Sequence, residues 1–103
     1  MDRVPGESDS GWNAVAIDRR DNVAVALAEL IGSANVLSEG REQFEISLLG
    51  SIPIGHKFAT RAISAGTAII KYGQAIGIAT LDIPIGAHVH VHNVVSDRAR
   101  SQR

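Results

Sequence analysis

Three of the four histidines in this chain stand at alternating positions in one short segment. The segment is GAHVHVHNVV, residues 86–95, and it places His88, His90 and His92 two residues apart. Alternate side chains of a strand point to the same face at intervals of about 6.5–7 Å. Imidazoles ligate metals and titrate near neutral pH. The pattern therefore predicts a row of groups that could bind a metal ion or hydrogen-bond an anionic substrate.

The spacing of these imidazoles also limits what they can do. Three rings on one flat strand are too far apart to bind a single ion, so we expect one or two histidines to act while another orients its neighbour. Val89 and Val91 would face the opposite side and pack in the core. The alternative is an edge strand whose histidines are simply its solvated face.

Two further groups of polar side chains flank glycine turns. His56 and Lys57 follow the IPIG turn at 52–55, where a basic pair and free backbone N–H groups suit a carboxylate. Lys71 and Tyr72 form a similar pair of donors. The alternatives are a surface hairpin for the first pair, and for the second a lysine stem and a tyrosine ring that cover the core.

The composition bounds the class of protein. With 103 residues, of which 45% are hydrophobic and 20% charged, we expect one globular domain with a single modest core. A formal net charge of −1 argues against bulk attraction to nucleic acid or an anionic membrane. Cysteine is absent, which excludes disulfides and thiolate metal sites. No apolar run approaches the roughly 20 residues of a membrane span. These features predict a cytoplasmic protein.

Glycine turns recur along the chain and separate short apolar stretches. IPIG stands at 52–55 and again at 83–86, and its glycine can adopt the positive φ that such turns need. β-branched segments between regularly spaced turns are typical of an all-β domain. We therefore expect an all-β domain over 12–95, a flexible N-terminus at 1–11 and a solvated tail at 96–103.

The segment NVAVALAELIG, residues 22–32, fits either a strand or a helix. Valines that alternate with alanines favour a strand covered on both faces in its first half, with a turn or short helix near 28–31. The alternative is a short helix capped by Asp21 or Asn22 and ended by Gly32.

Four motifs stand in an order that resembles a known family. They are DNVAVAL at 21–27, GHKFA at 55–59, IIKYGQAIGIA at 69–79 and IPIGAHVHVHN at 83–93. Together they resemble the small β-clip (antifreeze-like, SAF) domain of the altronate/galactarate dehydratase family, over nearly all of the expected domain. The resemblance implies a compact β-clip fold of short strands and hairpins, with room for one short helical turn.

The resemblance also implies an activity shared by two polypeptides. It implies the small subunit or N-terminal module of a metal-dependent hydro-lyase in carbohydrate catabolism, inactive alone, which completes the active site of a larger catalytic subunit. In this family a sugar acid or related 2-hydroxy acid loses a group β to its carboxylate. A divalent metal, Fe(II) or Mn(II), shared with the large subunit, would stabilise the enediolate-like intermediate. The histidine-rich segment resembles the altronate branch of the family.

The matched motifs imply roles for individual residues. They imply metal contacts for His88, His90 and His92, and catalytic roles for His56 and Lys57. Four further residues match the family motifs and are implied to contact the substrate: Asp21, Asn22, Lys71 and Tyr72.

Two alternatives to a dehydratase remain at this point. The same domain resembles the small (alpha) subunit of sulfolactate sulfo-lyase, which expels sulfite instead of water, and the motifs do not separate the two enzymes. The other alternative is a non-catalytic β-clip module that binds carbohydrate or protein, although such a module has no need of the histidine-rich segment. An exposed sheet edge would also let the chain form homo-oligomers.

Overall fold

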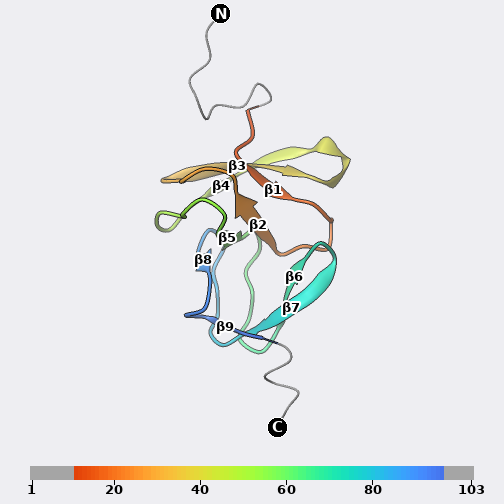
Figure 1. Ribbon diagram of the computed structural model, residues 1–103, viewed down its shortest axis with the longest axis vertical. Helices are drawn as coiled ribbons and strands as arrows, with labels where there is room; N and C mark the ends of the chain where they lie inside the picture. The colour runs from red at the N-terminus through yellow and green to blue at the C-terminus, as the bar shows by residue number, and fades with distance from the viewer. Residues whose placement is uncertain (1–10, 97–103) are drawn as a thin grey trace, which may run out of the picture.

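The computed structural model describes residues 11–96, and within them the chain folds into short strands arranged in two sheets (Figure 1). The predicted all-β class is confirmed. The expected flexible N-terminus and solvated tail lie outside the described residues, apart from one residue at each end. The strands are β1 (Ala14–Ala16), β2 (Val23–Ala26), β3 (Ser33–Ser38), β4 (Gln43–Ser47), β5 (Lys57–Ala59), β6 (Ala68–Lys71), β7 (Gln74–Ala79), β8 (His88–Val89) and β9 (Val94–Val95).

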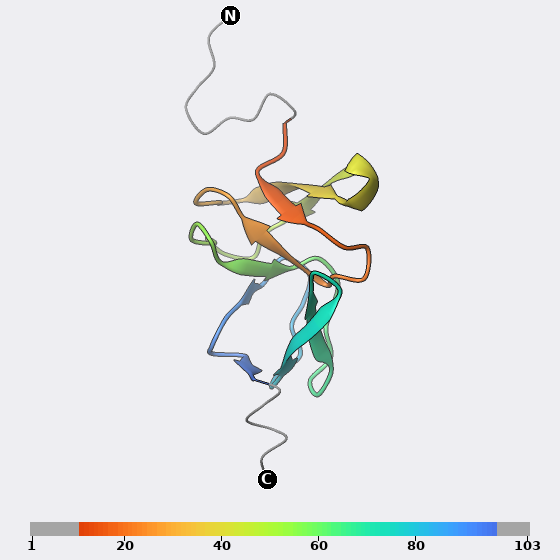
Figure 2. The ribbon, with the colours of Figure 1, turned by 45° about the vertical axis from the view of Figure 1, so that its right-hand side comes forward.

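The two sheets meet at the histidine-rich segment. The larger sheet has the order β4-β3-β1-β2-β5-β8 and the smaller one the order β6-β7-β9. β1 and β3 are parallel, whereas the other neighbours are antiparallel. β8 and β9 are consecutive in the chain but form edges of different sheets, so residues 90–93 connect the two (blue in Figure 2).

The ambiguous segment at 22–32 forms a strand in its first half, as the alternation of valine and alanine predicts. β2 pairs with β1 on one side and β5 on the other, and this pairing satisfies its backbone better than an isolated short helix could. Residues 28–31 form no helix. Instead Leu30 pairs with Ile52 in an isolated bridge. The one short helical turn in residues 11–96 lies at Glu39–Arg41.

The repeated IPIG motif builds two equivalent turns. Its first isoleucine is buried in both copies, Ile52 and Ile83. The chain then turns through a glycine at positive φ, +83° at Gly55 and +87° at Gly86. The N–H of the residue after each glycine donates to the carbonyl of the motif's proline, at 3.0 and 3.1 Å. A sequence repeat thus becomes a repeat of local structure.

The core is almost entirely aliphatic, as the shortage of aromatic residues predicts. One cluster lies on the larger sheet around Phe58. The second joins the two sheets: Val23 and Val89 come from the larger sheet, and Ile69 from the smaller. Residues 11–96 contain no helix with the length and hydropathy that crossing a membrane requires.

Candidate functional site

Of the three histidines in the segment, only His88 belongs to a strand: β8 ends at Val89, a turn closed by Asn93 follows, and β9 begins at Val94. The Asn93 side-chain oxygen accepts from the His90 N–H at 2.9 Å, and its nitrogen donates to the His88 carbonyl at 2.9 Å. Its backbone N–H donates to the His90 carbonyl at 3.0 Å. The prediction of one strand carrying all three histidines is therefore wrong, because a buried asparagine supplies the backbone partners that a neighbouring strand would have given.

The turn changes the environment of the valines between the histidines. Val89 is 2% exposed and packs in the core as predicted. Val91 is 81% exposed, so the prediction that it belongs to the core is wrong. Alternation of buried and exposed side chains holds only while the chain remains extended, and extension ends at β8. Sequence reasoning missed Asn93, although asparagine's preference for turns was a usable signal.

A fourth histidine approaches the segment from the adjacent strand. β5 and β8 are antiparallel, and Phe58 lies opposite His88. His56 directly precedes β5 and His90 directly follows β8, so the register continued by one pair puts these two residues opposite each other. Side chains opposite each other on paired strands share a face at about 4.5–5.5 Å, which is closer than neighbours along one strand. The pairing therefore gathers imidazoles that a single strand would hold apart.

The ring geometry agrees with this register. The ring centroids of His56 and His90 are 4.3 Å apart, and those of His56 and His88 are 5.0 Å apart. His56 Nδ1 and His88 Nε2 share a hydrogen bond of 2.8 Å. One ring nitrogen from each of these three residues lies within 4.8 Å of the others. His92 lies beside the group, with its ring 5.4 Å from that of His88, but its nitrogens are not in the converging set.

Three converging imidazoles fit a transition-metal ion. Two nitrogens bonded at about 2.0–2.1 Å to one tetrahedral zinc ion lie roughly 3.4 Å apart, so nitrogens within 4.8 Å of one another have to close by at most about 1.4 Å. Three protein ligands leave a coordination position open, as in catalytic metal sites. Imidazole donors suit iron, nickel, copper and zinc, whereas manganese favours carboxylate oxygens. The converging set contains no carboxylate.

The electrostatics of the cluster keep two of its rings neutral. Burial lowers the pKa of His88, and the imidazoles of His56, His90 and His92 lower it further. The pKa of His90 is lowered by the same loss of hydration, and also by His56, Lys57 and His92. A metal ion binds the neutral imidazole. The surroundings of these rings therefore favour the ligating form at neutral pH.

Lys57, which is next to His56 in the chain, and the nearby Lys71 have no acidic partner within residues 11–96. Burial lowers the pKa of Lys57, and the nearby Lys71 ammonium lowers it further. Lys71 Nζ lies 4.7 Å from the centroid of the Tyr72 ring, a cation–π contact at the β6–β7 turn. The ion pairs among residues 11–96 belong to two arginines of the β1–β2 connection and include neither lysine. This pair of cations favours binding of a carboxylate.

A groove of about 280 Å³ adjoins the cluster at Lys57 and His90. Its remaining lining is mostly aliphatic and comes from both sheets and the turn between them: Ile69, Ile76, Val89, Val91, Val94 and Ser96. The apolar groove and the polar cluster are thus continuous. Sequence patterns did not predict the groove, since it forms where separate sheets meet.

The structure gives Asp21 and Asn22 structural partners instead of a place in the cluster. Asp21 is buried, and its Oδ1 accepts from the Gly73 N–H at 2.9 Å. The Asn22 side chain donates to the Ala68 carbonyl at 3.0 Å and accepts from the Ile70 N–H at 2.8 Å. These bonds tie the β1–β2 connection to β6 and the β6–β7 turn. A structural role therefore accounts for both side chains.

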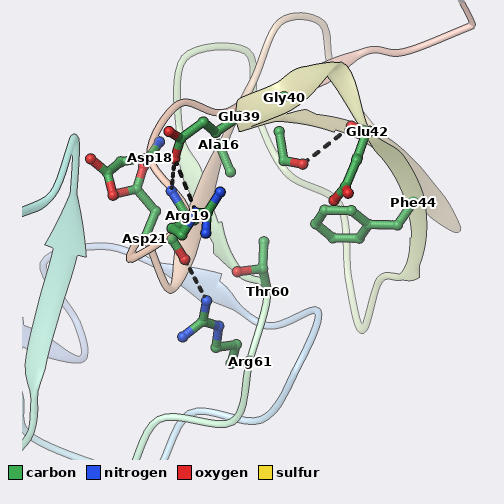
Figure 3. Close-up of a pocket in the computed structure, with 11 residues that line it drawn as sticks. Ala16, Asp18, Arg19, Asp21, Glu39, Gly40, Glu42, Phe44, Thr60 and Arg61 are labelled. Carbon is green, nitrogen blue, oxygen red and sulfur yellow. Dashed lines mark hydrogen bonds and ion pairs between the residues drawn. The ribbon is translucent and has the colours of Figure 1, made fainter.

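A second pocket, of about 420 Å³, lies between the β3–β4 hairpin and the β1–β2 connection (Figure 3). Its lining is rich in charged residues, and two of them, Arg19 and Glu39, form an ion pair with each other. Arg19 Nε lies 3.6 Å from a Glu39 carboxylate oxygen, and Arg61 donates to the Arg19 carbonyl at 2.7 Å. Hydrogen bonds from Arg20 lower the pKa of Asp18 to about 2. No histidine lines this pocket.

Known proteins similar to this chain share the histidine-bearing domain. The altronate/galactarate dehydratase SAF domain family matches residues 12–97. Altronate dehydratase of Escherichia coli is 43% identical over 79 residues, which are 77% of this chain but 15% of that protein. The (2R)-sulfolactate sulfo-lyase subunit alpha of Paracoccus pantotrophus is 40% identical over 63 residues, 61% of this chain and 94% of that subunit.

A further relative extends the match. The (2R)-sulfolactate sulfo-lyase subunit alpha of Chromohalobacter salexigens is 37% identical over 90 residues, 82% of this chain and 94% of that subunit. The chain therefore spans about 15% of the E. coli dehydratase but nearly the whole of these subunits. The family match covers every strand and all four histidines, and it confirms the resemblance drawn from the motifs: the chain belongs to the altronate/galactarate dehydratase SAF domain family.

Proposed function

We propose that this chain is the small module of a metal-dependent lyase that eliminates water from a sugar acid, as an altronate dehydratase does. In this proposal it completes an active site carried mainly by a larger polypeptide and is inactive alone. The observation that carries the proposal is the convergence of His56, His88 and His90 beside Lys57 in a domain of this family. A solvated edge strand does not require imidazoles from two strands to meet.

The three converging histidines would hold the metal ion. Their donor atoms favour Fe(II) over Mn(II), because imidazole suits iron whereas manganese prefers oxygen ligands. Such an ion would supply Lewis-acid stabilisation of the charge that develops on the substrate. The hydrogen bond between His56 and His88 has to break, and its ring proton has to leave, before both nitrogens can ligate. His92 would orient His88 through their ring contact.

The lysines would bind and activate the substrate. Lys71 carries positive charge with no acidic partner among residues 11–96, and a sugar acid offers a carboxylate that would pair with it. Burial and Lys71 lower the pKa of Lys57, which brings its amine closer to the range useful for removing the proton α to the carboxylate. Tyr72, in contact with Lys71, would help to fix the cation.

The larger polypeptide would supply what this site lacks. The converging set in residues 11–96 holds imidazoles alone, so further oxygen ligands and most of the substrate pocket have to come from elsewhere. In E. coli altronate dehydratase, the matched part is 15% of the protein. This proportion supports a division of labour between a small domain and a much larger remainder.

The activity of a sulfo-lyase subunit is a second candidate function with support of its own. The chain covers 94% of the subunit alpha of two sulfolactate sulfo-lyases, at 37% and 40% identity. Both reactions expel a group β to a carboxylate, so the same metal and lysines would serve either. The leaving group, water or sulfite, is then selected by residues outside this chain.

Reconstitution with a larger subunit of the family distinguishes these functions. The complex, loaded with Fe(II), is offered altronate and (2R)-sulfolactate in separate assays for keto-acid formation and sulfite release. Turnover of altronate supports the dehydratase, and sulfite release supports the sulfo-lyase. A stable complex that turns over neither substrate supports a binding module. Full activity after His56→Asn, His88→Asn and His90→Asn are combined would contradict the role of the histidines.

A further inference from the structure

The groove beside the histidines exposes apolar surface at an unusual place. Val91, 81% exposed, stands in the same turn as His90 and also lines the groove. Ile76, 41% exposed, lines it from β7. A single exposed valine needs no explanation, but these side chains form one surface with the buried walls of the groove and adjoin the candidate metal site. They give a partner a small apolar surface directly beside the histidines.

The chemistry of the groove does not suit the substrate. A sugar acid carries a hydroxyl group on most of its carbons, and burying a hydroxyl without a hydrogen bond is unfavourable. The groove walls are mostly aliphatic, with polar side chains at Lys57, His90 and Ser96. Its volume of about 280 Å³ is at the small end of ligand pockets, roughly 300–1,000 Å³. Groove size and lining instead fit an apolar side chain that anchors another polypeptide.

We propose that this groove is the docking site for the larger lyase polypeptide, which inserts an aliphatic or aromatic side chain between Val91 and Ile76. The inference rests on the proposed function, because a partner that completes the metal site has to lie against His90, and the groove continues directly from that residue. β8 and β9, the strands on either side of the turn, are edges of their sheets, so they leave this face open to a partner.

The relatives of this chain agree with an occupant of this kind. In the two sulfo-lyases the matching chain, of which the match covers 94%, is called subunit alpha, a name that implies a companion subunit. In E. coli altronate dehydratase the matched part belongs to a much longer polypeptide. In both arrangements, the histidine face of a small domain has a large protein surface available to cover it.

The test measures binding of this chain to the companion subunit of the Paracoccus pantotrophus sulfo-lyase by surface plasmon resonance, with that enzyme's own subunit alpha as positive control. Val91→Ser and Ile76→Ser remove the exposed walls of the groove without adding a charge or a strong metal ligand. Ile31→Ser is the matched control, because Ile31 is 74% exposed and lies outside the groove. We expect Val91→Ser and Ile76→Ser to raise Kd about tenfold or more, and Ile31→Ser to change it less than about twofold.

The outcomes separate docking from the metal site. Ni²⁺ titration of each isolated variant reports on the histidines and should match the wild type. The proposal is overturned if both groove variants bind the companion subunit as tightly as the wild type does. It is also overturned if the wild-type chain does not bind the companion subunit while the positive control does. The proposal is also overturned if light scattering shows that the wild-type chain is a dimer and that Val91→Ser dissociates it, because the groove is then occupied by a second copy of this chain. Wild-type chain that docks through Val91 but binds no Ni²⁺ overturns the proposed metal role and leaves the docking site intact.

Discussion

The pairing of His56 with His90 is the residue-level contact that gives the site its chemistry. These rings come from two strands and stack at a centroid distance of 4.3 Å, which one strand alone would not achieve. His56 also shares a hydrogen bond with His88, so it is the ring that links the other two. His92 touches the group only through His88 among the ring contacts of residues 11–96.

Removing a converging histidine should weaken metal binding more than removing His92. We expect His56→Asn and His90→Asn each to lower Ni²⁺ affinity of the isolated chain by more than the roughly 10–100-fold typical of losing a residue that only orients a ligand. His92→Asn should stay within that range. Isothermal titration calorimetry at pH 7.5 measures the three affinities. Equal losses for His56→Asn and His92→Asn would contradict the assignment of His56 as a ligand.

The pH dependence of stability follows from the same cluster. The pKa values of His88 and His90 are lowered from the ordinary histidine value in the folded chain, so the unfolded chain binds protons more readily. The free energy of unfolding should therefore be at its maximum above about pH 6.5 and should decrease as the pH drops below that value. Urea midpoints at pH 8.0 and pH 5.5 check the direction. The double variant His88→Asn/His90→Asn should show a smaller difference between the two midpoints. If the difference is undiminished, groups other than these two histidines cause the pH dependence of stability.

At the scale of elements, short strands are held in place by asparagine side chains that bond to the backbone, one buried (Asn93) and one half-buried (Asn22). Asn93 closes the turn after β8 through both of its side-chain groups. Asn22 does the equivalent for β6, also through both groups. Elements of two to four residues make few ladder bonds of their own, so these side chains determine where the strands end.

The two asparagines form a matched pair for testing this role. Asn93→Ala and Asn22→Ala should each cost about 1–3 kcal/mol, because each leaves backbone groups without partners. Only Asn93→Ala should also lower Ni²⁺ affinity, since Asn93 fixes the backbone of His88 and His90. Urea unfolding and Ni²⁺ titration of both variants measure the two effects. A loss of Ni²⁺ affinity in Asn22→Ala equal to that in Asn93→Ala would show that the effect is one of general stability.

The two IPIG turns should differ in their tolerance of a side chain. Gly55→Ala and Gly86→Ala both place alanine at positive φ, at a cost of about 1–2 kcal/mol. An added Cβ at Gly86 would also overlap the Ser47 carbonyl oxygen, whereas nothing lies within 4 Å of one at Gly55. We expect Gly86→Ala to be less stable by a further roughly 1–3 kcal/mol. Urea midpoints compare the stability of the two variants. Equal midpoints would mean that the backbone near Ser47 shifts at little cost to accommodate the added Cβ.

At the scale of the whole molecule, the second core cluster joins the two sheets into one unit. Val23 and Val89 of the larger sheet pack there with Ile69 of the smaller sheet. The histidine site and the apolar groove lie along this same junction, because residues 90–93 connect β8 to β9. The position of the site therefore depends on both sheets being folded.

A cavity in this shared cluster should destabilise the whole domain at once. Ile69→Ala should cost about 2–5 kcal/mol, since Ile69 is fully buried. Trp12, the single tryptophan, lies just before β1 in the larger sheet. Its fluorescence and the far-UV circular dichroism should shift to the same lower urea midpoint, as two-state unfolding requires. A Trp12 curve that stays at the wild-type midpoint would mean that the smaller sheet unfolds separately.

The sequence by itself determined the local features of this protein. Regular glycine turns and β-branched segments predicted an all-β domain, and the motifs identified its family before any fold was known. Alternation correctly placed Val89 in the core and made a strand of Val23–Ala26. These features depend on neighbours a few residues away, so local periodicity and turn preference are enough to predict them.

Only the tertiary structure decided how the site is assembled. His56 and His88 are 32 residues apart in the chain, and their contact depends on the register between β5 and β8, which no local pattern specifies. The bonds of Asn93 likewise overrode the alternation that would have buried Val91. Asp21 and Asn22, matched by a family motif, gained backbone partners in β6 and its turn. Residue types predict which chemistry is available, but strand pairing decides which side chains are close enough to perform it together.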